Sequence, residues 1–157
     1  MNEFHNLNIR RMEIKDYGEV CKLEKEIFPC PWSKSEIWKI LSEDKFALSL
    51  VAEIQNEIVG YSFIWVVCDE VHIGNFAIKE EYREKKIGTR LLQYIIDEAS
   101  KLGGMFFYLE VRKSNSPAIN LYKKFEFVPL SIRKNYYANN NEDAIVMCKY
   151  LNGVLQT

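Results

Sequence analysis

The sequence predicts one α/β domain, with a mixed, mainly antiparallel sheet flanked by helices, and three observations indicate it. The chain has 157 residues, of which 48% are hydrophobic and 27% charged, a composition typical of one globular domain. No linker, repeat or low-complexity segment divides the sequence, so we treat residues 1–157 as a single domain. Strand-like runs dominate the first half, whereas strand and helix patterns alternate in the second half, which favours layered α/β packing.

The first half begins with a strand and two helices. Leu7–Arg10 alternates as a short strand, and Tyr17–Phe28 carries apolar residues at helical spacing. Prolines then break the helix, and Ser33 with Glu36 three residues later predicts a capping box that opens a second helix ending near Leu41. A meander of three strands joined by polar turns follows, over Phe46–Ile54, Ile58–Val67 and Val71–Ile78.

The second half contains the most strongly amphipathic segment. From Ile87 to Leu102 apolar residues recur at helical spacing, and Gly103–Gly104 ends the pattern. The remaining predictions are a strand at Met105–Val111, a helix at Ser116–Lys124, and strands at Phe125–Ile132 and Ala144–Tyr150. The predicted order is therefore β-α-α-β-β-β-α-β-α-β-β.

Charge and cysteine content exclude several classes of protein. The formal net charge is −1, so no global field attracts the chain to nucleic acid or to an anionic membrane. The four cysteines form no C-x-x-C pair and there are only two histidines, so we expect no metal site and reduced, mostly buried thiols. We do not propose a cysteine nucleophile among these thiols.

The apolar runs and the N-terminus indicate the cellular location of the protein. The longest apolar runs are far shorter than the roughly 18 residues that span a bilayer, so no membrane segment is expected. Met1–His5 contains an acidic residue and leads into no apolar run, unlike a signal peptide. We therefore expect a cytoplasmic protein.

A glycine-containing basic loop precedes the strongest helix. A helix N-terminus presents unpaired N–H groups and about half a positive charge, which together attract anions. Gly88 would let a ligand approach the backbone, and Arg83, Lys85 and Lys86 add positive charge suited to phosphate. The alternative is a solvated, charged turn.

Three further side chains could take part in chemistry. Strand alternation places Phe106, Tyr108 and Glu110 on one face, so Glu110 could be partly desolvated. Desolvation would raise its pKa, which suits a general base. The alternative is that Glu110 is a carboxylate in water at a strand end. Tyr122, on the following helix, could donate a proton or simply be a core tyrosine. We interpret His72 as a half-exposed strand residue without a catalytic role.

Several motifs, in this order, resemble the GNAT superfamily of acetyl-CoA-dependent N-acetyltransferases over nearly the whole chain. Within it the chain looks like the ribosomal-protein-alanine N-acetyltransferases. The segments that carry this resemblance are Phe28–Ser33, Asn75–Ile78, Arg83–Gly88, Leu109–Arg112 with Ser114–Asn115, Ala118–Tyr122, Arg133–Tyr137 and Glu142–Ala144.

The resemblance implies where the two substrates and the catalytic groups lie. Acetyl-CoA would lie in a splay between the fourth and fifth strands, with Glu110 as general base and Tyr122 as general acid. Trp32, Tyr136 and Tyr137 are expected by their position to lie in exposed loops, and because aromatic walls commonly line peptide grooves we assign them to substrate binding, although they could instead cap the core. Arg112 is also assigned to substrate binding. The residues assigned to acetyl-CoA are Phe76, Ala77, Ile78, Arg83, Glu84, Lys85, Lys86, Ile87, Gly88, Thr89 and Asn115.

One position departs from the superfamily pattern. The loop usually has glycine where this chain has Lys86. A lysine is less suited than glycine to positive φ, but its ammonium could pair with a phosphate, so we expect acetyl-CoA binding to be retained.

The expected function is acetylation of the N-terminal alanine, or a similar small residue, of a ribosomal protein. An α-amino group has a pKa near 7.7–8.0 and a lysine near 10.4, so a modest base is sufficient for an α-amine. Two alternatives remain open: acetylation of a small-molecule amine or lysine side chain, and a non-catalytic acyl-CoA-binding module. The oligomeric state is not predicted.

Overall fold

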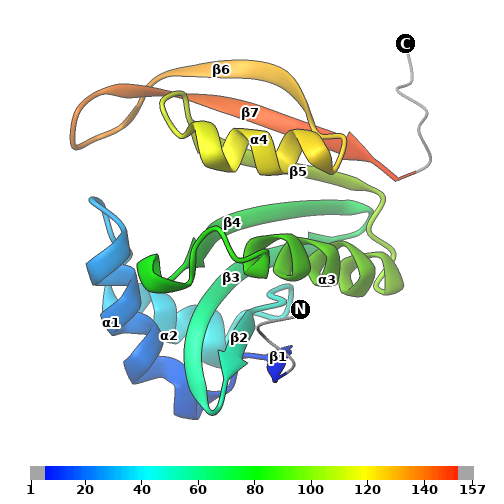
Figure 1. The fold of residues 1–157 in the computed structure, drawn as a ribbon. Coiled ribbons are helices and arrows are strands. Elements are labelled where there is room, and N and C mark those ends of the chain that lie inside the picture. The colour runs from blue at the N-terminus through cyan, green and yellow to red at the C-terminus, as the bar shows by residue number, and fades with distance from the viewer. Residues whose placement is uncertain (1–5, 152–157) are drawn as a thin grey trace.

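The computed structural model describes residues 6–151, so the expectation about Met1–His5 lies outside the described residues. It contains one seven-stranded sheet in the order β1-β2-β3-β4-β5-β7-β6 (Figure 1). The strands are β1 Leu7–Arg11, β2 Leu50–Ile54, β3 Glu57–Val67, β4 Glu70–Ile78, β5 Phe106–Arg112, β6 Val128–Tyr137 and β7 Glu142–Tyr150. The α-helices are α1 Tyr17–Ile27, α2 Lys34–Ser42, α3 Ile87–Lys101 and α4 Ser116–Lys124.

The element order and the mainly antiparallel sheet are confirmed. Every neighbouring pair of strands is antiparallel except β4 and β5, which run parallel. The Ser33–Glu36 capping box forms, and the turn between β2 and β3 has Gln55 and Asn56 at positive φ, as a tight hairpin requires. Two short 3₁₀ helices, Ile14–Asp16 and Glu80–Tyr82, were not predicted.

Two predicted strand boundaries are wrong. Strand β2 starts at Leu50 rather than Phe46, because before it only Ala47 forms an isolated bridge, with Trp65. Strand β6 starts at Val128 rather than Phe125, because the chain leaves α4 through a turn in which Glu126 has a φ of 67°. It then continues to Tyr137, so Tyr136 and Tyr137 lie on a strand rather than in a loop.

Helices cover both faces of the sheet. Helix α3 packs its apolar stripe on β2, β3 and β4, in a core that also contains the buried Phe107 and Leu109 of β5, and α4 lies on the same face (Figure 1). Helices α1 and α2 pack on the opposite face of β3, against Tyr61 and Phe63. The two faces therefore have separate cores, and the part of the sheet formed by β5–β7 has a helix on one face only.

A bulge in β4 changes which side chains face each core. Ser62 pairs with Phe76 and Ile64 pairs with Ile73, so β4 contains one extra residue between these two pairs. Before the bulge Ile73 belongs to the α3 core, whereas after it Phe76 packs against that core. The bulge thus shifts the alternation of side chains by one residue.

Strands β4 and β5 pair over only part of their length. Their register runs from Glu70↔Phe106 to Ile73↔Leu109, although β4 continues to Ile78 and β5 to Arg112. Beyond these pairs the strands diverge, as seen in Figure 1. The predicted splay is therefore present, and the edge of β4 after Ile73 has no strand partner on the β5 side within the described chain.

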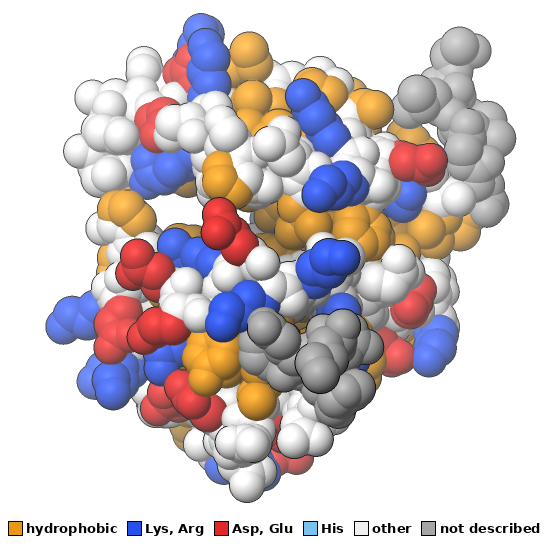
Figure 2. Space-filling model, in the orientation of Figure 1, with side chains coloured by type: hydrophobic (Ala, Val, Ile, Leu, Met, Phe, Trp, Pro, Cys, Tyr) orange, Lys and Arg blue, Asp and Glu red, His pale blue; other side chains and the backbone are white. Residues whose placement is uncertain are grey.

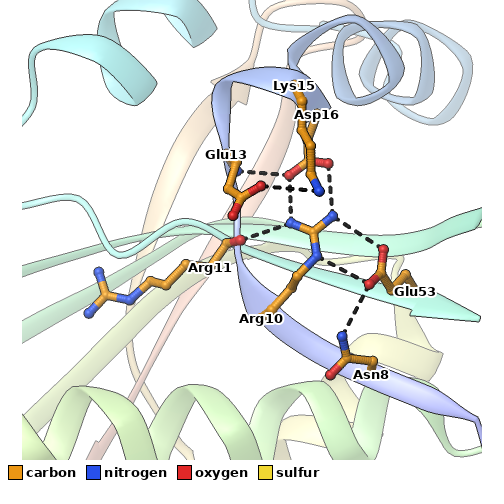
Figure 3. Close-up of polar contacts among 7 residues, drawn as sticks. All are labelled: Asn8, Arg10, Arg11, Glu13, Lys15, Asp16 and Glu53. Atoms are coloured by element: carbon orange, nitrogen blue, oxygen red, sulfur yellow. Dashed lines mark hydrogen bonds and ion pairs between the residues drawn. The ribbon is translucent and has the colours of Figure 1, made fainter. Parts of the chain in front are cut away.

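A polar network ties the first strand to the sheet. Figure 3 shows the guanidinium of Arg10 between two carboxylates: it donates to both oxygens of Asp16 at 2.8 and 2.9 Å, and to both oxygens of Glu53 at 3.2 Å. Asn8 also donates to Glu53, and Asp16 accepts from the backbone N–H of Glu13. Because Glu53 lies on β2, the network joins β1, β2 and the start of α1.

The cysteines only partly match expectation. Cys21 and Cys148 are buried, but Cys30 and Cys68 are exposed, so the expectation of mostly buried thiols is wrong for half of them. Both exposed thiols lie in connections, one after α1 and one in the β3–β4 turn. None of the described helices is both long and apolar enough to cross a membrane.

Candidate functional site

The predicted anion-binding loop enters α3 in a left-handed conformation. Glu84 has a φ of 61° and Lys86, the N-cap, a φ of 64°. No side chain caps this helix end, so the backbone N–H groups of its first turn point out of the helix without a capping acceptor from the described chain. Arg83 reaches back and donates from Nε to the carbonyl of Ile78 at 3.0 Å. The loop is thereby fixed against the end of β4.

The start of α3 lies beside α4 at the splay. A Cβ placed on Gly88 would lie 3.4 Å from Leu121, 3.7 Å from Phe76 and 3.8 Å from Ile78. Two of the predicted cofactor residues of β4 therefore lie next to the glycine of the loop. Figure 2 shows that the surface is hollowed between α3 and α4, with hydrophobic side chains in the hollow and Lys and Arg side chains around it.

The predicted cofactor residues occupy three places. Phe76–Ile78 form the end of β4 that has no partner on the β5 side, and Arg83–Thr89 form the loop and the first turn of α3. Asn115 is the N-cap of α4, where its Oδ1 accepts from the N–H of Ala118 at 3.3 Å. This amide oxygen is engaged in capping, so only the NH₂ group of Asn115 remains for a ligand.

Glu110 is desolvated, as predicted from strand alternation. Its side chain is 10% exposed, and its Oε2 lies 2.7 Å from Nε2 of His72 on β4. Arg133, on β6, lies 3.8 Å from its other oxygen. The interpretation of Glu110 as a water-exposed carboxylate at a strand end is therefore excluded.

The direction of the Glu110 pKa differs from our expectation. Burial acts to raise this pKa, but the hydrogen bond and positive charge of His72, with the charge of Arg133, outweigh burial and lower the pKa below its ordinary value. Glu110 is therefore a buried but ionised carboxylate. His72 is half-exposed as predicted, but no local pattern in the sequence predicts its contact with Glu110.

Tyr122 lies across the splay from β4. Its ring packs edge-on against Phe76, with centroids 6.1 Å apart, and the residue is 5% exposed. Its hydroxyl forms no hydrogen bond to any described residue. Burial raises the pKa of Tyr122, which keeps the phenol protonated.

An aromatic row crosses the α1/α2 face of the sheet toward Glu110. The ring of Trp32 stacks on Phe63 at 5.3 Å, Trp65 stacks on His72 at 5.7 Å, and His72 stacks on Tyr108 at 4.7 Å. Trp65 is held by a 2.7 Å hydrogen bond from its indole to Asp44. Trp32 therefore packs on the core, and the row holds the His72 imidazole beside Glu110.

Arg112 is fully engaged within the β6–β7 hairpin. Its guanidinium donates to the side chains of Asn139, Asn140 and Glu142 and lies 3.9 Å from the ring centroid of Tyr137. The expected contact between Arg112 and substrate stays a prediction, and in the structure the guanidinium binds side chains of the hairpin. Burial raises the pKa of Tyr137 to about 12, and the ring of Tyr136 packs edge-on against Tyr137.

Our sequence interpretation missed Glu24 and Asn75 as well as the role of His72. Glu24, on α1, is 0% exposed, and it binds Tyr61, Asn75 and the backbone of Trp32. One signal could have revealed it: Glu24 lies four residues after Val20 on the apolar side of an amphipathic helix, where a charged residue is rare. Among the described residues, no group of three or more His, Cys, Asp or Glu side chains could hold a metal ion.

Comparison with known proteins identifies the family. The model of the acetyltransferase (GNAT) family matches residues 17–127. A Bacillus subtilis (strain 168) protein, named provisionally as a [ribosomal protein bS18]-alanine N-acetyltransferase, is 40% identical over 92% of this chain and 95% of its own length. The [ribosomal protein bS18]-alanine N-acetyltransferase of Salmonella typhimurium is 34% identical over 84% of this chain and 89% of its own length.

A solved structure agrees with this relationship. The ribosomal-protein-S18-alanine N-acetyltransferase from Escherichia coli superposes with a TM-score of 0.85 and 30% identity, over 92% of this chain and 93% of that one. Sequence and fold therefore match along almost the whole length of these relatives. The chain belongs to the acetyltransferase (GNAT) family and is an N-acetyltransferase.

Proposed function

We propose that this protein transfers the acetyl group of acetyl-CoA to the α-amino group of the N-terminal alanine of ribosomal protein bS18. The observation that carries this proposal is the buried, ionised carboxylate of Glu110 at the point where β4 and β5 diverge. The activity named for relatives that match most of the chain supports the choice of substrate.

The residues at the splay fit acetyl-CoA. The pantetheine arm carries amide groups, and the edge of β4 after Ile73 offers backbone partners that no strand occupies. The uncapped start of α3, with Arg83 and Lys86 nearby, suits the pyrophosphate. When bound, acetyl-CoA supplies an activated acetyl thioester. We assign Phe76–Ile78, Arg83–Thr89 and the NH₂ group of Asn115 to holding it.

Glu110 is assigned the role of general base. Because its pKa is lowered, the carboxylate is ionised at neutral pH and can accept a proton from the amine, directly or through a water. A carboxylate of low pKa is a weak base, which suits an α-amine better than a lysine, since about a tenth of α-amines are already neutral at pH 7. His72 orients the carboxylate.

Tyr122 is assigned the role of general acid, which returns a proton to the thiolate of the leaving CoA. Its buried phenol stays protonated and its hydroxyl has no partner among residues 6–151, so the proton is free to be donated. Trp32, Tyr136 and Tyr137 are assigned to the walls of the peptide site, and Arg112 positions the hairpin that carries the two tyrosines.

Release of CoA thiol tests the proposed activity. Purified protein is given acetyl-CoA and peptides that begin with Ala, Ser or Met, together with an acetyl-blocked Ala peptide that contains an internal lysine. We expect release only with free N-termini, and fastest with alanine. Release with the blocked peptide or only with small amines would assign a different acceptor, and acetyl-CoA binding without any release would assign a non-catalytic module.

Two variants test the catalytic roles. Glu110→Gln should lower kcat/KM by about 10²–10⁴-fold, the usual contribution of a general base, and remove the contribution of Glu110 ionisation from the acidic limb of the pH profile. Tyr122→Phe should lower kcat with little change in KM. The matched controls are Glu19→Gln, at an exposed position of α1, and Tyr94→Phe, at a partly buried position of α3. Kinetics like those of the unaltered protein in both site variants would overturn the assignment.

A further inference from the structure

Glu24 is a fully buried carboxylate that no cation neutralises. Its Oε1 accepts from the Tyr61 hydroxyl at 2.8 Å, its Oε2 accepts from the backbone N–H of Trp32 at 3.2 Å, and the Nδ2 of Asn75 lies 2.7 Å from both oxygens. All these donors are neutral, and no ion pair joins Glu24 to a described Lys, Arg or His. A buried charge held only by neutral groups is costly, so a function for it is worth seeking.

The carboxylate fixes which way the amide of Asn75 faces. An ionised carboxylate only accepts hydrogen bonds, whereas an amide has one donating end and one accepting end. The NH₂ end of Asn75 must therefore face Glu24, and its Oδ1 must face away. This Oδ1 accepts no hydrogen bond from any residue between 6 and 151, although the side chain is partly buried.

The bulge in β4 brings this oxygen to the proposed reaction site. Asn75 lies in the bulged stretch, just after Ile73, the last residue of β4 that pairs with β5. Because the bulge shifts the alternation, Asn75 faces α1 and lies on the same face of the sheet as His72, which contacts Glu110. The free acceptor of Asn75 is thus placed where the two strands begin to diverge.

A reacting amine needs two acceptors. A neutral primary amine has one lone pair and two N–H bonds, and its lone pair points at the acetyl carbon only when both N–H bonds are directed elsewhere. Glu110 can take one of them. We propose that Oδ1 of Asn75 accepts the other N–H of the substrate amine, and that Glu24 is the positioning residue that fixes the Asn75 amide in this orientation. This inference rests on the proposed function.

A double-mutant cycle tests the proposal. The variants are Asn75→Ala, Glu24→Gln and the two combined, and each is assayed for kcat/KM with the best peptide and for the Kd of CoA. Asn75→Ala should lower kcat/KM by about tenfold, the value of one hydrogen bond, and leave the Kd of CoA within twofold. Glu24→Gln should give a similar loss, since glutamine can donate and so lets the amide reverse. The double variant should lose no more than Asn75→Ala alone.

Tyr61→Phe is the matched control. It removes another donor to Glu24 but leaves Nδ2 of Asn75 in place, so it should lower the melting temperature without lowering kcat/KM for the peptide. If Glu24→Gln does not fold, Asn75→Ala still tests the proposed contact between Asn75 and the substrate amine. Loss of that contact lowers kcat/KM for the peptide and leaves the Kd of CoA unchanged.

Three results would overturn the proposal. Additive losses in the double variant would show that the two residues act independently. A tenfold weaker Kd of CoA in Asn75→Ala would assign Asn75 to the donor, and an equal loss of kcat/KM in Tyr61→Phe would reduce Glu24 to a structural role. The double-mutant cycle can use any peptide with a free N-terminus that the unaltered protein acetylates. A preference for a residue other than alanine would therefore contradict the proposed function but leave this inference intact.

Discussion

At the scale of single residues, two carboxylates on one face of the sheet have pKa values shifted in opposite directions. Burial acts to raise both. Glu110 has His72 and Arg133 beside it, and its pKa is lowered, whereas Glu24 is bound only by neutral donors and its pKa is raised. Among the described residues, Glu110 has the partners His72 and Arg133, which lower its pKa, whereas the more deeply buried Glu24 has no such partners.

The contact with His72 predicts a measurable shift. His72→Phe keeps a ring for stacking on Trp65 and Tyr108 but removes the hydrogen bond, so the pKa of Glu110 should rise. Titration of the ¹³Cδ signal of Glu110 measures this directly. A carboxyl whose pKa is lowered in the folded state stabilises the fold at pH values above its unfolded pKa of 4.5, and this stability is lost as the pH falls through the folded pKa. The variant should therefore have a smaller free energy of unfolding than the unaltered protein above pH 4.5.

The matching control is Phe106→Leu, which alters the aromatic face without touching the Glu110 contact. It should leave the titration of Glu110 unchanged. An unshifted signal in His72→Phe would instead mean that Arg133 alone sets the charge state of Glu110.

Sequence alone could predict part of this chemistry. Alternation in β5 left two interpretations of Glu110 open, a desolvated carboxylate and one in water, and the burial of its side chain selects the first. The lowered pKa could not be predicted, because the partners come from β4 and β6, and the hydrogen bond joins residues 38 positions apart in sequence. Glu24 was missed for a similar reason, since its three partners lie on three different segments.

At the scale of elements, the start of α3 combines a helix N-terminus that no side chain caps with backbone strain. Lys86 adopts a left-handed conformation, which costs a non-glycine residue about 1–2 kcal/mol. The chain retains lysine where the superfamily pattern has glycine. The positive charge that Lys86 adds to the loop is therefore accompanied by a lower conformational stability of the folded protein.

Replacing this lysine separates strain from binding. Lys86→Gly should stabilise the protein by about 0.5–1 kcal/mol, because relief of strain exceeds the added entropy of the unfolded chain. Denaturant unfolding measures this. Calorimetry should show that the variant binds acetyl-CoA no more tightly than the unaltered protein does, because the ammonium is lost. The loss of affinity should be less than tenfold. Binding tighter by tenfold or more would contradict a role for the lysine in holding phosphate.

Elements with strong local signals were predicted well, and those set by tertiary context were not. The signals of the Ser33–Glu36 capping box, the polar turn between β2 and β3 and the stripe of α3 are local, and the structure confirms them. The extent of β6 depends on pairing with β7, which begins at Glu142, and no local pattern marks where that pairing ends. The β4 bulge likewise has no signal in the sequence of β4 alone.

At the scale of the whole molecule, the sheet consists of two parts joined by a short stretch of pairing between β4 and β5. Strands β1–β4 carry α1–α3, and strands β5–β7 carry α4 (Figure 1). A ligand in the splay would contact both parts. Binding should therefore stabilise the molecule as a unit.

Added CoA should raise the melting temperature. At a concentration of 100 Kd a ligand adds about 2.7 kcal/mol, which corresponds to about 5–10 °C for a chain of this size. Hydrogen exchange should slow both in residues 74–78 of β4 and in α4. Adenosine 3′,5′-bisphosphate, which lacks the pantetheine arm, is the control and should protect only the start of α3. If CoA slowed hydrogen exchange only in β4 or only in α4, the result would contradict a ligand that bridges the splay.

The bulge in β4 has a consequence for the order of events in a catalytic cycle. One extra residue turns Phe76 toward α3 and Asn75 toward α1, so a single strand presents side chains to both faces of the sheet at the gap between β4 and β5. Under the assignments proposed above, the donor would reach this gap from the α3 face and the peptide from the α1 face. Neither reactant would then have to pass the other, so those assignments predict that a peptide can leave while the donor stays, and that the donor can be exchanged while a peptide waits.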